Sequence, residues 1–156
     1  MPQDVTLFYG SLRDNFTLSE TQVSDAALVR AAEIANLSEF INRHPQGFDM
    51  VISERGDSLS GGQRKCVALA RAVVNDPPIL MMDEPTGSMD HSTEMAVKQQ
   101  LAEYVKGRTW RVVTHRNSLL ERVDRIIVID NGKLVADGPR DSVVQALQQG
   151  KIGKAQ

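Results

Sequence analysis

Short apolar runs alternate along this chain with longer stretches of helix-forming residues, and the two kinds of stretch predict strands and helices in turn. Helix formers follow Ser24 and Ser60, and a serine at such a position caps the first turn of a helix. Asn131–Gly132, between two apolar runs, is typical of a tight hairpin turn. We expect helices at 11–16, 24–35, 60–74, 92–104 and 141–149. We expect strands at 5–9, 79–82, 109–114, 125–130 and 133–137, with 44–57 mainly a loop.

The segment 79–83 sets the fold class. Its run Ile-Leu-Met-Met is uniformly apolar and closes with Asp83, which is typical of a strand buried on both faces of a parallel sheet. Because strands alternate with helices, we predict an α/β domain with a mainly parallel sheet and flanking helices. We expect a helical part at about 11–75, a part built on the sheet at about 76–150, and a flexible tail at 151–156.

Three features of the chain carry possible chemistry. Ser60-Gly61-Gly62 stands before a predicted helix, where free backbone N–H groups and the helix dipole favour a phosphate. Asp83 and Glu84 end a buried strand, at the sheet edge where open α/β folds hold their ligands. His115 ends a later strand and is expected at the same edge.

Each of these features by itself also fits an ordinary structural role. Ser-Gly-Gly occurs in plain capped turns, and Asp-Glu occurs in turns or helix caps after core strands. A lone histidine at a strand end is often a surface residue. Cys66, near a helix start, fits either a thiol with a lowered pKa or a small buried core residue.

Composition and charge exclude several classes of function. The 18 basic and 20 acidic residues give a net charge of -2, so a bulk positive field for nucleic acid is not indicated. Aromatic residues make up 4% of the chain, too few for a platform that stacks single strands. The longest stretch without a charged side chain, 142–150, is too short to span a bilayer, and we expect no secretory signal peptide, because the sequence shows no basic start followed by an apolar run. A single cysteine fits a reducing compartment.

Four motifs follow one another in a fixed order. They are LSGGQ at 59–63, ILMMDEP at 79–85, SMD at 88–90 and the strand-terminal His115. In this order they resemble the signature motif, Walker B, D-loop and switch histidine of the ATP-binding cassette (ABC) transporter ATPases, and the resemblance extends over essentially the whole chain. Gln3 is similar to the family's Q-loop glutamine. The segment 7–15 resembles exporters, and DEPTGSMDHSTE at 83–94 is most similar to type I secretion ATPases.

The resemblance implies ATP and Mg²⁺ as cofactors and assigns a role to each motif. Glu84 would polarise the attacking water, and His115 would contact the γ-phosphate, so these two residues are the expected catalytic pair. Asp83 and Gln3 would hold Mg²⁺. Asp90 would couple two nucleotide sites, besides capping the next helix. The signature residues expected to contact nucleotide are Leu59, Ser60, Gly61, Gly62 and Gln63.

One family motif does not occur in the 156 residues. The phosphate loop G-x-x-x-x-G-K-[ST], which cradles the phosphates of ATP, has no match, and each Gly-Lys pair lacks the earlier glycine and the following Ser or Thr. We therefore expect this chain to be the carboxyl-terminal part of a longer cassette of the P-loop NTPase-like fold. We also expect the chain alone to be inactive in ATP hydrolysis.

The same resemblance implies partners and a location. A second ABC ATPase domain would bind head to tail. A transmembrane domain of an exporter, on the same full-length chain, would couple this nucleotide-driven dimerisation to transport. The cassette would then work at the cytoplasmic face of the inner membrane, with no nucleic acid involved. Two alternatives stay open: a soluble ABC-type ATPase that acts on nucleic acid or the ribosome, and an inactive module that docks on an intact cassette.

Overall fold

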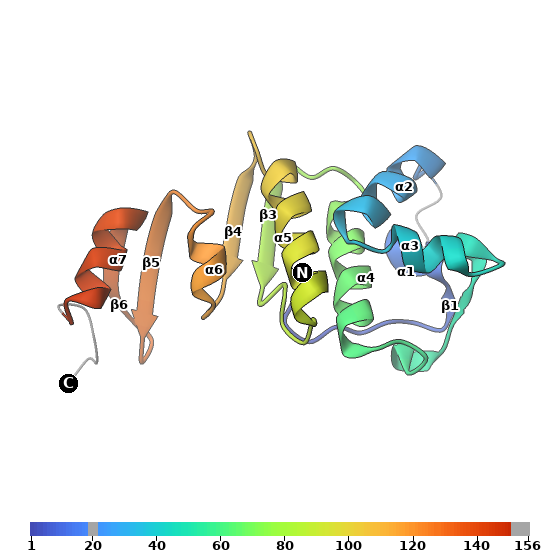
Figure 1. The fold of residues 1–156 in the computed structure, drawn as a ribbon, viewed down its shortest axis with the longest axis horizontal. Coiled ribbons are helices and arrows are strands. Elements are labelled where there is room, and N and C mark those ends of the chain that lie inside the picture. Colours follow the sequence, from blue (N-terminus) through green and yellow to red (C-terminus); the bar gives the residue numbers. More distant parts are fainter. Residues whose placement is uncertain (19–21, 151–156) are drawn as a thin grey trace. The chain divides into compact units, whose positions relative to one another are not determined.

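The computed structural model describes residues 1–18 and 22–150, which fall into two compact units. The first unit is Met1–Thr114 and the second begins at His115 (Figure 1). The division near residue 75, between a helical part and a part built on the sheet, is of a different kind and stays a prediction. The tail expected at 151–156 lies outside the described residues.

The first unit holds most of the expected elements. Its helices are α1 (Leu12–Thr17), α2 (Asp25–Ile34), α3 (Ser38–Arg43), α4 (Gly61–Val73) and α5 (His91–Tyr104). Its strands are β1 (Gly10–Ser11), β2 (Val51–Ile52), β3 (Ile79–Asp83) and β4 (Thr109–Val113), with short 3-10 turns η1 (Gly47–Asp49) and η2 (Glu54–Gly56). The serine caps predicted at Ser24 and Ser60 are confirmed, and Ser11 caps α1 in the same way.

The second unit is a hairpin with two helices. Its elements are α6 (Asn117–Leu120), β5 (Arg125–Asp130), β6 (Lys133–Pro139) and α7 (Arg140–Gln148). β5 and β6 pair antiparallel, and both Asn131 (φ 47°) and Gly132 (φ 74°) take the left-handed backbone that this tight turn requires. The predicted hairpin is confirmed.

The strand predicted at 5–9 does not form. The backbone groups of Phe8, within this segment, are taken by a side chain instead: Asn15 Oδ1 accepts from Phe8 N at 2.9 Å, and Asn15 Nδ2 donates to Phe8 O at 2.9 Å. Because one buried amide replaces a neighbouring strand, this segment is anchored without joining a sheet. Helices α3 and α6, both short, were not expected.

Helix α4 forms the centre of the first unit's core. It contacts both α1 and α2, and Figure 1 shows it between those helices and α5. Cys66, Val67, Leu69, Ala70 and Val73 are buried along it, at 2% exposure or less. Burying this much apolar surface is the main force that holds a domain of this size together.

β3 and β4 form the parallel pair predicted from sequence. Helix α5 connects the two strands, which pair side by side with Ile79 opposite Thr109 and Asp83 opposite Val113. The expected burial of β3 on both faces is wrong. Leu80 and Met82 are each 2% exposed, whereas Ile79 and Met81 are 58% and 59% exposed. Within the described residues, only the face toward the core is covered by other elements.

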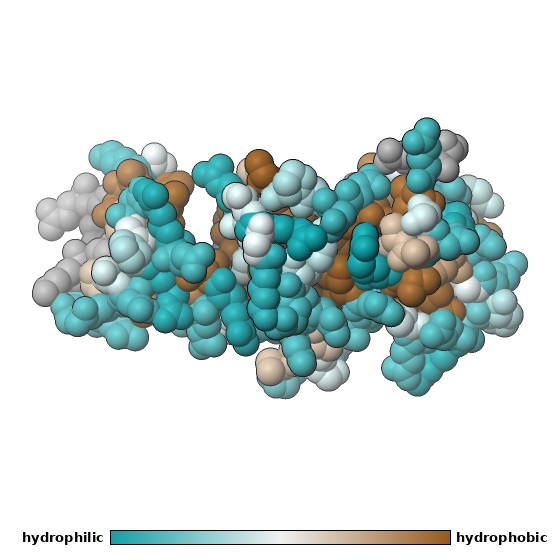
Figure 2. All heavy atoms as spheres, turned by 90° about the horizontal axis from the view of Figure 1, so that it is seen from above, coloured by the Kyte–Doolittle hydropathy of each residue, from teal (hydrophilic) through white to brown (hydrophobic). Residues whose placement is uncertain are grey.

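Apolar side chains also reach the surface elsewhere. Brown apolar areas lie among the teal polar ones in Figure 2, and the exposed residues include Val113 beside β3 and Ile127, Ile129 and Leu134 in the second unit's hairpin. Within residues 1–18 and 22–150, the pairs β1–β2 and β5–β6 are antiparallel, and the parallel pairing is that of β3 with β4.

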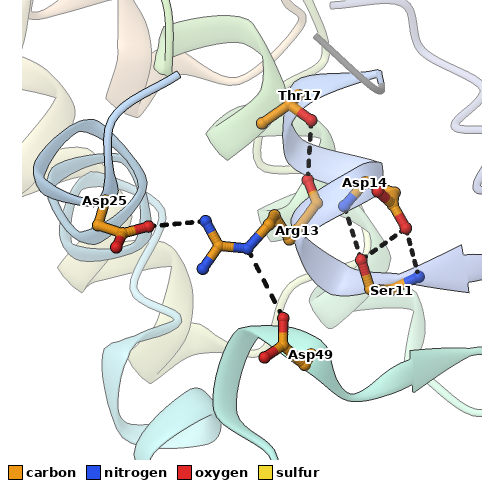
Figure 3. A network of polar contacts seen from close by, with 6 residues as sticks. All are labelled: Ser11, Arg13, Asp14, Thr17, Asp25 and Asp49. Carbon is orange, nitrogen blue, oxygen red and sulfur yellow. Dashed lines mark hydrogen bonds and ion pairs between the residues drawn. The ribbon is translucent and has the colours of Figure 1, made fainter. Parts of the chain in front are cut away.

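A polar network joins the small helices of the first unit (Figure 3). Arg13 of α1 donates to Asp25 at the start of α2 at 2.7 Å and lies 3.6 Å from Asp49 in η1. Ser11 and Asp14 cap α1 reciprocally, since each side chain bonds to the other residue's backbone N–H at 3.0 Å. Arg13 thus links three elements that are distant in sequence.

Over residues 1–18 and 22–150, no helix has both the length and the apolar character that a bilayer span requires.

The buried position of Cys66 leads to a prediction about its reactivity. Burial raises the pKa of the Cys66 thiol to about 12, so the reactive thiolate is scarce at pH 8, in contrast to the lowered pKa that its helix position suggested. A disulfide reagent should therefore modify Cys66 of the folded chain at least about a hundredfold more slowly than Cys66 of the chain unfolded in urea. Equal rates, followed by absorbance, would contradict this assignment.

Candidate functional site

The start of α4 is built by the signature residues. Ser60 Oγ accepts from Gln63 N at 3.1 Å, and Gln63 Oε1 accepts from Ser60 N at 2.9 Å, which forms a complete capping box. Ser60 is exposed and Leu59 is buried beneath it. The Ser60 hydroxyl keeps its proton for a ligand, because the cap uses only its oxygen as an acceptor.

The two signature glycines pack closely on the segment after Glu84. A Cβ on Gly62 would lie 3.4 Å from Ser88 O and 3.5 Å from Met89 Cα, and one on Gly61 would lie 3.5 Å from Ser88 Cβ. The absence of side chains at 61 and 62 therefore lets this segment lie against the helix start. The structure brings the signature motif and the D-loop residues together within one unit.

The acid end of β3 carries an unusual backbone conformation. Glu84 has φ 43°, in the left-handed region that non-glycine residues adopt at a cost of about 1–2 kcal/mol. Glu84 N donates to Val113 O of β4 at 2.9 Å, and Thr114 Oγ1 donates to the Glu84 carboxylate at 3.3 Å. Asp83 N donates to Met1 O at 3.0 Å. Both carboxylates are partly exposed at the end of the sheet.

Asp90 caps α5. Its carboxylate accepts from Ser92 Oγ at 2.6 Å, from Thr93 Oγ1 at 2.6 Å and from Thr93 N at 3.0 Å. Hydrogen bonds from Ser92 and then Thr93 hold the pKa of Asp90 well below its usual range. The capping role considered from the sequence is confirmed, and the coupling role stays a prediction.

Gln3 is tied to the site through its backbone. Its carbonyl accepts from Lys65 Nζ, and the same ammonium donates to Glu84 O at 3.4 Å. Lys65 is buried, whereas Gln3 itself is exposed. The Q-loop residue and the acid end of β3 are therefore joined by one side chain of α4.

His115 is the first residue of the second unit and is exposed. It directly follows Thr114, the residue that contacts the Glu84 carboxylate. His115 belongs to the second unit, whereas Asp83 and Glu84 belong to the first. The catalytic role expected for His115 therefore stays a prediction.

The carboxylates do not form a ready-made metal cage. Among the residues that the structure describes, no three His, Cys, Asp or Glu side chains gather into a metal site. Mg²⁺ is commonly bound through only one or two carboxylates, with phosphate oxygens and waters as the other ligands. The two acids at the end of β3 fit that kind of site.

Comparison with known proteins identifies the family. The family model described as "ABC transporter" matches residues 1–87, more than half of the chain. The chain belongs to the ABC transporter family. It is 46% identical over 138 residues to an ATP-dependent lipid A-core flippase of Alkalilimnicola ehrlichii, and 38% identical over 143 residues to the leukotoxin translocation ATP-binding protein LktB of Mannheimia glucosida.

A solved structure supports the fold as well. A bacterial Atm1-family ABC exporter with ATP bound matches with a TM-score of 0.85 and 35% sequence identity over 92% of this chain. The matches cover 87% and 92% of this chain for the flippase and LktB but only 23% and 20% of those proteins, and 25% of the exporter. The ABC ATPase fold predicted from the motifs is confirmed, and this chain spans about a quarter of these relatives' length.

Two residues of the site had no role assigned from the sequence. Lys65 lies on the buried side of α4, four residues before Leu69 and eight before Val73, and this helical spacing was the available signal. For Thr114, the only available signal was its position at the end of a predicted strand. A contact between residues 30 positions apart, as between Thr114 and Glu84, follows from the register of β3 and β4 and not from local sequence.

The capping carboxylate of Asp90 should make stability depend on pH. Because the folded-state pKa is lowered, the contribution of Asp90 to stability is complete above the ordinary aspartate pKa of 3.8 and is lost as the pH falls below it. Asp90→Asn keeps a capping side chain but not the charge. We expect wild type to unfold at a higher urea concentration than Asp90→Asn at pH 7, with the gap shrinking toward pH 3. A gap that is constant over this range, measured by circular dichroism, would contradict the assignment.

Proposed function

We propose that this chain supplies the signature, Walker B and D-loop part of the ATP-binding and ATP-hydrolysing cassette of an ABC exporter. One observation carries the proposal: Glu84 is held in a left-handed conformation at the acid end of β3, and the segment that follows it packs against Gly61 and Gly62. Strained backbone of that kind clusters at active sites and ligand clamps. The exporters among the relatives support the same conclusion.

The residues present fit ATP with Mg²⁺. Mg²⁺, when bound, would offset negative charge on the phosphates. Asp83 and Gln3 would hold the ion, and Glu84 would orient and polarise the water that attacks the γ-phosphate, a contribution of about 10²–10⁴ in rate. Thr114 would fix the Glu84 carboxylate. The exposed histidine at 115 would contact the γ-phosphate.

The signature residues would serve a nucleotide held mainly by another cassette. Ser60 is exposed at the N-terminus of a 13-residue helix, where a phosphate is favoured by the dipole and by the free N–H groups. This supports a head-to-tail dimer, in which the helix start faces the ATP of a second ABC ATPase domain. A transmembrane domain would be the other partner, which puts the cassette at the cytoplasmic face of the membrane.

The relatives' names do not agree on a cargo. They include a lipid A-core flippase, a leukotoxin translocation protein and a β-(1→2)glucan export protein of Rhodopseudomonas palustris. We therefore propose the exporter class, within which type I protein secretion is the narrower prediction from the segment 83–94.

The first test concerns the 156-residue polypeptide itself. Because no G-x-x-x-x-G-K-[ST] motif occurs in it, the purified chain should release phosphate from Mg-ATP no faster than a sample without protein. Steady turnover by this polypeptide, abolished by Glu84→Gln, would contradict the proposal that a phosphate loop must come from additional sequence.

The second test restores a phosphate loop. The lipid A-core flippase of Alkalilimnicola ehrlichii would carry residues 1–150 of this chain in place of its matching segment, a chimera that we call the hybrid exporter. We expect ATP hydrolysis by the hybrid exporter, and a fall in kcat of at least about a hundredfold in its Glu84→Gln variant, because an amide cannot act as a base. Glu103→Gln, on the exposed end of α5, is the matched control and should keep full activity. A hybrid that folds but hydrolyses no ATP would overturn the proposal.

A further inference from the structure

Lys65 is a buried cation whose hydrogen bonds go to the backbone of two separate parts of the site. Its side chain is 8% exposed, within the part of α4 that packs into the core. The ammonium donates to the carbonyl of Gln3, 62 residues earlier, and to that of Glu84, 19 residues later, at 3.4 Å. One side chain of α4, which we call the signature helix because the signature motif starts it, thus holds both the Q-loop residue and the acid end of β3.

Packing alone does not explain a lysine here. Removing an ammonium from water costs free energy, and burial accordingly lowers the pKa of Lys65, opposed by the carboxylates of Asp4, Asp83 and Glu84. A methionine has nearly the same length and would fill the space without that cost. What a methionine lacks is the ability to donate to two carbonyls.

The Glu84 carbonyl is one of the groups that fix an unfavourable turn. Glu84 has a positive φ, and its carbonyl accepts from Gly87 N at 3.1 Å as well as from Lys65. Its N–H is held by Val113 O at 2.9 Å. Such a conformation persists only where the surroundings over-determine it, and Lys65 contributes the contact that comes from α4.

We propose that Lys65 is a positioning residue for ATP hydrolysis: it fastens the Gln3 backbone and the Glu84 backbone to the signature helix, so that all three keep one relative geometry. The inference rests on the proposed function, because it concerns the same site. Lys65 does not reach the reacting atoms itself. It acts by keeping the carboxylate that polarises water in register with the loop that holds Mg²⁺.

Arg71 provides a matched comparison on the same helix. Its guanidinium is also partly buried and also donates to backbone carbonyls, those of Asn15 at 2.8 Å and Thr6 at 3.1 Å. These acceptors follow Gln3 in sequence and do not include Glu84. Arg71→Met therefore removes hydrogen bonds between α4 and backbone carbonyls, as Lys65→Met does, while leaving the Lys65 contacts in place.

The first experiment measures the contact directly in the 156-residue chain. Hydrogen exchange followed by mass spectrometry should show the backbone amides of residues 83, 84, 86 and 87 exchanging at least about tenfold faster in Lys65→Met than in wild type, because one hydrogen bond that holds the turn is gone. Lys65→Arg, which keeps a cation with several donors, should stay within threefold of wild type. Arg71→Met should leave these amides unchanged. Exchange in Lys65→Met equal to wild type would overturn the inference.

The second experiment measures catalysis in the hybrid exporter. Lys65→Met should lower kcat about 10- to 100-fold per folded molecule and leave the KM for ATP within twofold, since a small misplacement of a catalytic group affects the reaction more than binding. Lys65→Arg should recover at least a third of the wild-type kcat, and Arg71→Met should stay within threefold of it. Loss of folded protein with unchanged kcat would mean a merely structural role and would overturn the inference.

The two readouts separate the inference from the proposed function. A hybrid exporter that is inactive before any substitution rejects the proposed function, and the exchange measurement on the chain then still decides whether Lys65 holds the turn. An active hybrid whose Lys65→Met variant keeps its kcat leaves the proposed function intact and rejects the role of Lys65.

Discussion

The burial of helix α4 is the constraint on which the rest of the first unit depends. Its apolar residues from Cys66 to Val73 fill the core, so the helix cannot shift without exposing that surface to water. Its polar residues are attached to a helix that is already fixed. Ser60 starts it, Lys65 holds Gln3 and Glu84, and Arg71 holds the segment that follows the Q-loop.

A single rigid helix can therefore relate sites that belong to different motifs. The signature end is exposed, the middle reaches the acid end of β3, and the later part donates to Thr6 and Asn15, at the two ends of the stretch that holds the exporter-like segment 7–15. Hydrogen bonds to a buried helix are less screened by water than the same bonds on the surface, so they transmit position more faithfully.

Much of this arrangement was predictable from local sequence. Serine caps, the apolar run before Asp83 and the Asn-Gly turn are short-range signals, and each gave its element within a few residues. The failures came from tertiary structure. The segment 5–9 has strand-forming residues, but the Asn15 amide takes the backbone groups of Phe8. β3 looked like a strand buried on both sides, but the described residues cover only one face.

The site shows the same difference between local sequence signals and tertiary contacts. Asp83, Glu84 and the signature residues were predicted from the motifs, because the order of these motifs along the chain is specific. Nothing local indicated that Lys65 would reach across to the Gln3 carbonyl or that Thr114 would reach the Glu84 carboxylate, since both contacts depend on how α4, β3 and β4 pack. Side chains that support catalytic residues from other elements are the part that the sequence leaves undetermined.

The left-handed backbone at Glu84 implies a trade-off between durability and activity. Glycine or asparagine would adopt φ 43° at less cost, so either would make the fold more robust while removing the carboxylate. In the proposed function, selection for turnover would retain at position 84 a residue that folding alone disfavours. We expect duplicated copies that lose their catalytic duty to drift toward glycine or asparagine at this position, which would make it an indicator of decay in related genes.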